Sequence, residues 1–191
     1  MLRASFRSAM PARPAGFAAD QSGVSAVEFA ILLPLMLTLY LGGVEISQAV
    51  SADRKTTVVA HTIGDLTAQA QNVTSADMTN ILNAASAIAY PYAASNLAVT
   101  VSSVCIDSTG TKATVAWSKT SNGTARSGVV TTSIPTALMV ANTSLIWGEA
   151  SYSYRPTIGW TITGTLNLKD QFFMRPRLSN SVTLDSASAC P

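Results

Sequence analysis

The sequence predicts an α+β protein with a long N-terminal helix, a second short helix and a small antiparallel β-sheet. Two observations lead to this class. Residues 29–44 carry no charge, and from residue 96 onward apolar and polar residues alternate with a period of two. The first pattern is typical of a helix in apolar surroundings, and the second of strands with one covered face. We expect four segments, which are a basic leader, an apolar helix, a helical spine with the second helix, and a β-rich domain, at 1–23, 24–50, 51–95 and 96–191.

The apolar helix has the length of a membrane span. From Val24 to Val44 there are 21 residues with Glu28 as the only charge. As a helix they would extend over about 31 Å, close to the thickness of a bilayer hydrocarbon core. Apolar side chains fall on every side, which favours a membrane helix over the core helix of a soluble domain. Pro34 removes the hydrogen bond to the Ala30 carbonyl, so a helix kink is expected there.

Beyond Val50 the helix is expected to continue as an amphipathic spine. Residues 51–70 contain no proline, and their apolar side chains recur at helical spacing. Gly64 is the expected weak point, because glycine has a low helix propensity. His61 stands four residues before Asp65, so these two side chains can pair on the helix surface.

A second helix is predicted over Ser75–Ala89. Thr74 or Ser75 can cap its N-terminus, and Asp77 stands in the first turn, where the backbone N–H groups lack helical partners. Apolar residues repeat along one side of this segment, and Pro91 ends it.

The first two strands are predicted as a hairpin. Residues 97–106 and 113–118 alternate in polarity around a turn at 107–110. The apolar phase shifts at Val104, which indicates a bulge or a strand end. A polar loop follows at 121–128.

Further strands are predicted toward the C-terminus. Residues 146–155 give the clearest alternation, which Pro156 ends, and 160–168 alternate again. A last strand over 171–178 is confined to a sheet edge, because Pro176 cannot donate to the ladder. The segment 134–141 is ambiguous and is compatible with a short helix.

The positive charge of the chain lies before the apolar helix. Arg3, Arg7 and Arg13 stand against Asp20, and the nine basic and nine acidic residues that follow cancel, so the net charge of +2 belongs to residues 1–23. Basic residues hold their end of a membrane helix in the cytoplasm. We therefore expect a single pass through a bacterial inner membrane with a periplasmic C-terminal domain. The later basic residues are scattered, which argues against nucleic-acid binding.

Two cysteines and no catalytic motif limit the chemistry. Cys105 and Cys190 lie too far apart for a redox CxxC motif or for most zinc sites. In an oxidising compartment they can form a disulfide, and two free buried thiols are the alternative. No nucleotide-binding loop, zinc-protease motif or supported carboxylate pair occurs, so we expect no enzyme, no cofactor and no metal.

Glu28 is the informative residue of the apolar helix, because a carboxylate there needs a partner. After a cut between Gly23 and Val24, Glu28 would be the fifth residue and could pair with the new α-amino group of its own or a neighbouring chain. Such a pair is stronger in a low dielectric than in water. The alternative is a Glu28 side chain that snorkels to the cytoplasmic interface.

The residues around this glycine carry a family resemblance. The string GVSAVEFA at 23–30, which runs into LLP at 32–34, resembles the TadE-like pseudopilins of tight-adherence (type IVc, Flp) pilus systems. The later strings YSYRP and RPR also resemble these proteins, and they contain Arg155, Arg175 and Arg177. These arginines are candidates for contact with a partner subunit, and surface ion pairs are the alternative.

The resemblance implies a pilin-like fold and a function. A prepilin peptidase would cut between Gly23 and Val24, and Glu28 and Phe29 would then set the register of assembly. The chain would act as a minor pilin or pseudopilin in pilus assembly, priming or adhesion. Its partners would be the peptidase, other pilin subunits, the inner-membrane assembly platform and membrane lipid, and the assembled pilus would be extracellular.

Two alternatives remain open. An uncleaved, membrane-anchored periplasmic protein could scaffold a secretion system or bind a ligand, although such an anchor would have no need of Gly23. Cleavage by ordinary signal peptidase is the other, but the apolar segment is longer than a signal peptide requires. An extracytoplasmic hydrolase is disfavoured, because no nucleophile set is recognisable.

Overall fold

A computed structural model describes residues 22–159, 164–186 and 190, and its elements confirm the α+β class. The chain divides into two compact units, one that ends at Gly43 and one that begins at Val44. The first unit contains the start of helix α1 (Ser22–Ala68), and the second contains the remainder of α1 and all other elements.

Helix α1 is continuous over 47 residues and includes Pro34. The Thr38 hydroxyl donates a hydrogen bond of 2.7 Å to the Pro34 carbonyl oxygen, one turn earlier. Tertiary packing sustains the helix at its C-terminal end, where Val59, Ala60 and Ile63 are fully buried. Propensity alone would not decide the outcome over this length.

Gly64 is not a weak point of α1, contrary to expectation, but a site of close packing. It lies against Gly148 of strand β4 (Ser144–Tyr154). A Cβ atom at Gly148 would stand 2.6 Å from the Ala60 carbonyl oxygen, whereas one at Gly64 would stand 3.9 Å from the Gly148 Cα. The helix backbone therefore rests directly on the strand backbone, which only a glycine on the strand permits.

Helix α2 (Ser75–Ala89) has the predicted bounds, and its N-terminus explains why. The Thr74 hydroxyl accepts the Asp77 N–H at 3.1 Å, and the Asp77 carboxylate accepts the Thr74 N–H at 3.1 Å. This reciprocal capping box satisfies backbone donors that the helix leaves unpaired. The Thr74 hydroxyl also donates to the Asp77 carboxylate at 2.6 Å. This bond, followed by the one from the Thr74 N–H, lowers the pKa of Asp77.

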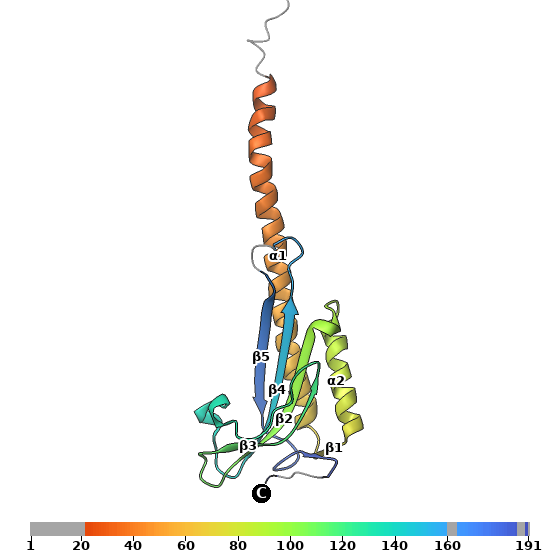
Figure 1. Ribbon diagram of the computed structural model, residues 1–191, viewed down its shortest axis with the longest axis vertical. Coiled ribbons are helices and arrows are strands. Elements are labelled where there is room, and N and C mark those ends of the chain that lie inside the picture. The colour runs from red at the N-terminus through yellow and green to blue at the C-terminus, as the bar shows by residue number, and fades with distance from the viewer. Residues whose placement is uncertain (1–21, 160–163, 187–189, 191) are drawn as a thin grey trace, which may run out of the picture. The chain divides into compact units, whose positions relative to one another are not determined.

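Four antiparallel strands form the main sheet in the order β3–β2–β4–β5 (Figure 1). The predicted hairpin is confirmed as β2 (Leu97–Ile106) and β3 (Ala113–Ser121), and its register shifts between Ser103 and Val104 at the predicted bulge. Strand β4 lies beside β2 in the middle of the sheet, and β5 (Leu166–Met174) lies at the edge.

The expectation of two strands over 160–168 and 171–178 was wrong. A single strand, β5, begins at Leu166 and ends before Pro176, and residues 160–163 lie outside the described residues. Pairing with β4 runs without interruption from Leu166 to Met174, so the partner strand sets the bounds of β5. The segment 134–141 contains a short 3₁₀ helix at Thr136–Leu138.

The sheet has two differently covered faces. Helices α1 and α2 cover one face and form the main core with the inward side chains of β2 and β4. The segment from Val130 to Met139 covers one end of the opposite face, over a smaller core around Trp147 and Leu145. Among the described residues the largest side chains with less than 2% exposure are Trp147, Ile63, Met78, Leu145 and Ile146.

The turn between β2 and β3 is organised by Asp107. Its carboxylate accepts the Thr109 hydroxyl at 2.6 Å and the N–H groups of Thr111 and Lys112 at 2.8 and 3.1 Å. The hydrogen bond from Thr109 is the main cause that lowers the pKa of Asp107 to about 2. Gly110, with a φ of 70°, supplies the left-handed position that this turn needs.

We call residues 177–186 together with Cys190 the C-terminal strap. Its strand β6 (Thr183–Leu184) pairs in parallel with β1 (Asn72–Val73), which connects the two helices. Asp185 accepts the N–H and the hydroxyl of Ser75 at 2.8 and 2.6 Å, at the start of α2. The strap thus holds the junction between α1 and α2 from outside.

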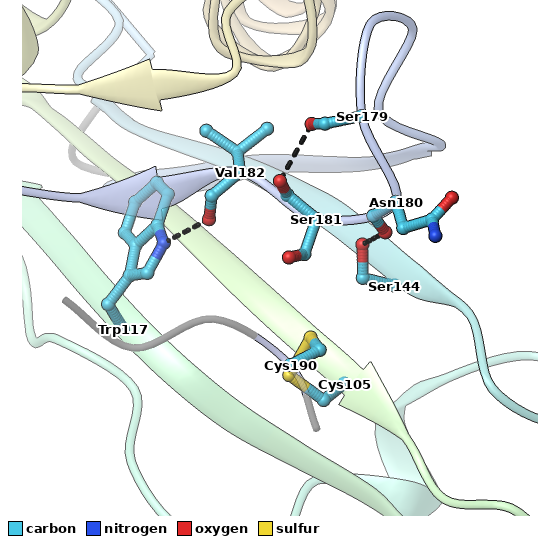
Figure 2. The surroundings of a disulfide bond; sticks show 8 residues. All are labelled: Cys105, Trp117, Ser144, Ser179, Asn180, Ser181, Val182 and Cys190. Atoms are coloured by element: carbon cyan, nitrogen blue, oxygen red, sulfur yellow. Dashed lines mark hydrogen bonds between the residues drawn. A yellow bond between two sulfur atoms is a disulfide. The ribbon is translucent and has the colours of Figure 1, made fainter. Parts of the chain in front are cut away.

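Figure 2 shows how the strap is fixed to the sheet. A disulfide joins Cys105 at the end of β2 to Cys190, with 5.4 Å between the Cα atoms. The Trp117 indole donates a hydrogen bond of 2.8 Å to the Val182 carbonyl oxygen, and the Ser144 hydroxyl donates one of 2.6 Å to Asn180 (Figure 2). Strands β2, β3 and β4 each therefore contact the strap.

Candidate functional site

The first unit exposes apolar side chains in every direction. Between Val24 and Leu41 the large apolar side chains are 37–71% exposed, and the most apolar part of α1 has a mean hydropathy of 2.0. Among the described residues, α1 is the one helix that is long and apolar enough to cross a membrane. Exposed apolar surface on this scale is unfavourable in water and requires lipid or other apolar helices around it.

The candidate processing residues lie at the start of this helix. Gly23 has no neighbouring atom within 4 Å of the place where a Cβ would stand, and Val24 and Glu28 are exposed. Val24 and Glu28 are four positions apart, so they lie on the same side of α1, one turn from each other. Helical side chains lean toward the N-terminus, which directs the Glu28 carboxylate back toward Val24.

Residues 23–63 match the TadE-like protein family.

The match contains Gly23, Glu28, Phe29 and Pro34, the residues on which the resemblance was based. No curated protein and no solved structure matches the chain. The matched segment lies within α1, and this helix is consistent with a single-pass membrane anchor. Among the described residues no group of three metal-ligating side chains occurs.

A second carboxylate of the TadE-like segment, Glu45, ties α1 to the loop after β4. It accepts the backbone N–H groups of Ile158 and Gly159, the latter at 2.8 Å. A Cβ at Gly159 would stand 2.7 Å from the same carboxylate oxygen, so the loop approaches closely. Burial, with the nearby Glu45 charge as a further cause, raises the pKa of Tyr154 in the adjoining strand. The sequence alone does not single out Glu45, because its hydrogen-bond donors lie more than a hundred residues away.

The candidate partner arginines take different positions. Arg177 forms an ion pair with Asp65 of α1, and the backbone N–H of Arg177 donates to the Ala68 carbonyl oxygen at 2.9 Å. Arg155 and Arg175 are exposed at either end of the β4–β5 pair. The expected pairing of His61 with Asp65 was wrong. Asp65 binds Arg177, and the His61 ring stacks on Phe172 of β5 with 3.7 Å between centroids.

A polar hollow lies on the sheet face that the helices leave uncovered. It has a volume of about 1150 Å³ and is lined by β2, β4, β5 and the loop that follows β3. In its wall the Arg126 guanidinium donates two hydrogen bonds to Glu149, at 2.9 and 2.6 Å. The same guanidinium lies 4.6 Å from the centre of the buried Trp147 ring. The hydrogen bond that Arg126 donates to Glu149 is the main cause that raises the pKa of Arg126.

Proposed function

We propose that the chain is a minor pilin or pseudopilin of a tight-adherence pilus, cut between Gly23 and Val24 by a prepilin peptidase. The observation that carries the proposal is an exposed apolar helix whose first turn contains Gly23 and whose second contains Glu28. A peptidase can reach Gly23, because no described side chain covers it. The family match over the same residues supports this role.

Glu28 would set the register of assembly. Cleavage would leave an α-amino group on Val24, one helical turn from the Glu28 carboxylate. In lipid or among packed helices both charges need a partner, and each can supply the other, within one chain or between neighbouring subunits. Phe29 lies beside Glu28 and is 59% exposed, so it is available to pack against a neighbouring helix.

The remaining parts follow from this role. Residues 1–23 would be a cytoplasmic leader, 24–50 the membrane span, and the rest a periplasmic domain, which would become extracellular in an assembled pilus. The basic residues of the leader support this orientation. Other pilin subunits, the inner-membrane assembly platform and membrane lipid would be the partners of α1. The exposed Arg155 and Arg175 would contact a neighbouring subunit.

The deciding experiment is N-terminal sequencing and intact-mass measurement of the chain isolated from its native membrane. We expect a terminus at Val24, and we expect it to disappear in a Gly23→Leu variant. Gly42→Leu is the matched control, because Gly42 also lies in α1 with no atom within 4 Å of its Cβ position. A wild-type terminus at Met1 would instead establish an uncleaved membrane anchor.

Glu28→Gln tests the assembly step separately. This variant should still be cleaved, because the side chain lies beyond the cut, but it should enter pili poorly, because the new α-amino group has lost its charged partner. Glu28→Asp, which keeps the charge, is the control. Normal piliation by cells that carry only Glu28→Gln would contradict the role assigned to this residue.

A further inference from the structure

The hollow beside Arg126 is a candidate ligand-binding site, and it lies wholly within the second unit. Its floor is the outward face of β2, β4 and β5, where Thr100, Glu149 and Ser151 alternate with inward-facing core residues. Gln171 and Lys169 stand opposite Glu149 and Ser151 on the edge strand. All of these elements belong to the unit that begins at Val44.

The wall of the hollow is held in place before any ligand arrives. Arg126 is fixed by two hydrogen bonds to Glu149 and by its position over Trp147, and its backbone N–H donates to the Ser118 hydroxyl at 3.0 Å. Gly123 brings the loop against β2 and β3, where a Cβ would stand 2.7 Å from the Thr120 hydroxyl. A preorganised wall reduces the entropy lost on binding.

The groups that face the hollow are mostly neutral hydrogen-bonding groups. Hydroxyl and amide side chains line it, together with short side chains that leave the floor open. These polar residues include Thr100, Ser127, Thr132, Ser133, Ser151 and Gln171. Arg126 donates two of its five side-chain N–H groups to Glu149, and its side chain is still 43% exposed. The hollow therefore offers many donors and acceptors in a small volume.

One positive charge in the hollow is not neutralised. The charges of Arg126 and Glu149 offset each other. Asp170 also borders the hollow, but it stands opposite Ala150 and shares a strand face with Phe172, which packs against His61 of α1, so its side chain belongs to the inward face. Lys169, in contrast, is exposed at the rim and has no ion-pair partner among residues 22–159, 164–186 and 190. The hollow therefore favours a ligand with a modest negative charge.

These features exclude several classes of ligand. An extended peptide cannot add to the floor as a strand, because β2 and β4 are interior strands whose backbone groups are already paired. A polyphosphate or nucleic acid would need several unpaired cations, and the hollow has one. A lipid or other apolar ligand would need large apolar side chains, and Val129 is the one large exposed apolar residue of the lining.

We propose that the hollow binds an acidic saccharide, whose hydroxyls pair with the side chains of the floor and loop and whose carboxylate pairs with Lys169. This inference deepens the adhesive part of the proposed function by naming a class of ligand. It assigns no role to Gly23 or Glu28, so the two proposals fail separately.

The test measures binding of short galacturonic acid oligomers to the full-length chain in detergent, by calorimetry at low salt. Neutral maltose oligomers of equal length and a short polyglutamate peptide are the comparison ligands. We expect saturable binding of the acidic oligomers, weaker binding of the neutral ones, and none of the peptide. Added salt should weaken binding of the acidic oligomers until it approaches that of the neutral ones, because exposed charges are screened.

Three variants locate the binding. Lys169→Gln should weaken binding of the acidic oligomers about three- to fivefold, the scale of one exposed charge pair, and should leave the neutral oligomers unchanged. Gln171→Trp should weaken both, because an indole at this exposed position on the edge strand would cover part of the floor of the hollow. Lys112→Gln, an exposed lysine outside the hollow, should change neither.

Four results would overturn the inference. The first is that the acidic oligomers show no saturable binding, and the second is that Gln171→Trp leaves their binding unchanged. The third is that Lys169→Gln and Lys112→Gln weaken binding equally, and the fourth is that polyglutamate binds as strongly as the saccharide. The N-terminus of each preparation is sequenced in parallel. Cleavage at Gly23 without saccharide binding would refute this inference alone, whereas saccharide binding without cleavage would refute the processing step alone.

Discussion

The contact between Gly148 and α1 gives the sharpest stability prediction. In Gly148→Ala the new Cβ would stand 2.6 Å from the Ala60 carbonyl oxygen and 3.4 Å from the Gly64 Cα. Both neighbours are helix backbone, so no side-chain rotation can relieve the overlap. Because close carbon–oxygen contacts in proteins begin at about 3.3 Å, α1 must retreat from β4 by roughly 0.7 Å.

The cost follows from what that retreat does to the core. A gap of about 0.5–1 Å forfeits a quarter to a half of the dispersion energy of each contact across it. Overpacked core positions lose about 1–3 kcal/mol in general, and replacing a strand glycine by alanine returns roughly 0.5–1 kcal/mol of chain entropy. We therefore expect Gly148→Ala to lower the free energy of unfolding by about 1 kcal/mol.

Gly64→Ala is the matched control from the other side of the same contact. Its Cβ would stand 3.9 Å from the Gly148 Cα, an ordinary contact, and alanine raises helix propensity by about 1 kcal/mol. This variant should equal or exceed the wild type in stability.

The assay is urea unfolding of the full-length chain in detergent, followed by the fluorescence of the buried Trp117 and Trp147. Equal unfolding midpoints for Gly148→Ala and the wild type, or a greater loss in Gly64→Ala, would refute the reasoning.

Three further predictions concern the second unit. Replacing both Cys105 and Cys190 by serine should lower the free energy of unfolding by about 4 kcal/mol, because the disulfide spans 85 residues. Reductant should bring the unfolding midpoint of the wild type to that of this variant. The wild type should lose stability as the pH falls from 3.8 toward about 2, because protonation of Asp107 weakens the hydrogen bonds that its charged carboxylate accepts in the native turn. Asp107→Asn should be less sensitive to pH in this range. An unchanged pH dependence of stability in that variant would contradict the role given to Asp107. Arg126→Ala should lower the free energy of unfolding by about 1 kcal/mol, and adding Glu149→Gln should restore part of this loss. If the effects of the two substitutions simply add, the two side chains are not coupled as proposed.

Elements with local signals were predictable. The bounds of α2 follow from Thr74, Asp77 and Pro91, which lie within 18 residues of one another, and the β2–β3 hairpin follows from alternation around one turn. The apolar helix and its glycine also needed no tertiary information, because their signal is composition and spacing along a single helix.

Elements that depend on distant partners were not predictable. Strands β1 and β6 have two residues each, and their pairing of Asn72 with Thr183 has no local pattern. The bounds of β5 are set by β4, and the partner of Asp65 is Arg177 rather than His61 because the strap returns to α1. The hollow was missed for the same reason, since its floor and its loop become adjacent only after the sheet has formed.

The strap also has a consequence for the order of events during synthesis. Asp65, Asn72 and Ser75 emerge early, but their partners in the strap follow more than a hundred residues later. The junction between α1 and α2 must therefore remain incompletely bonded until synthesis has reached at least Asp185. Long-range contacts of this kind form slowly, because a long loop must close before they contribute. The Cys105–Cys190 bond can form only after the whole intervening segment has been made, so a chain arrested before Cys190 would keep Cys105 as a free thiol and could be distinguished chemically.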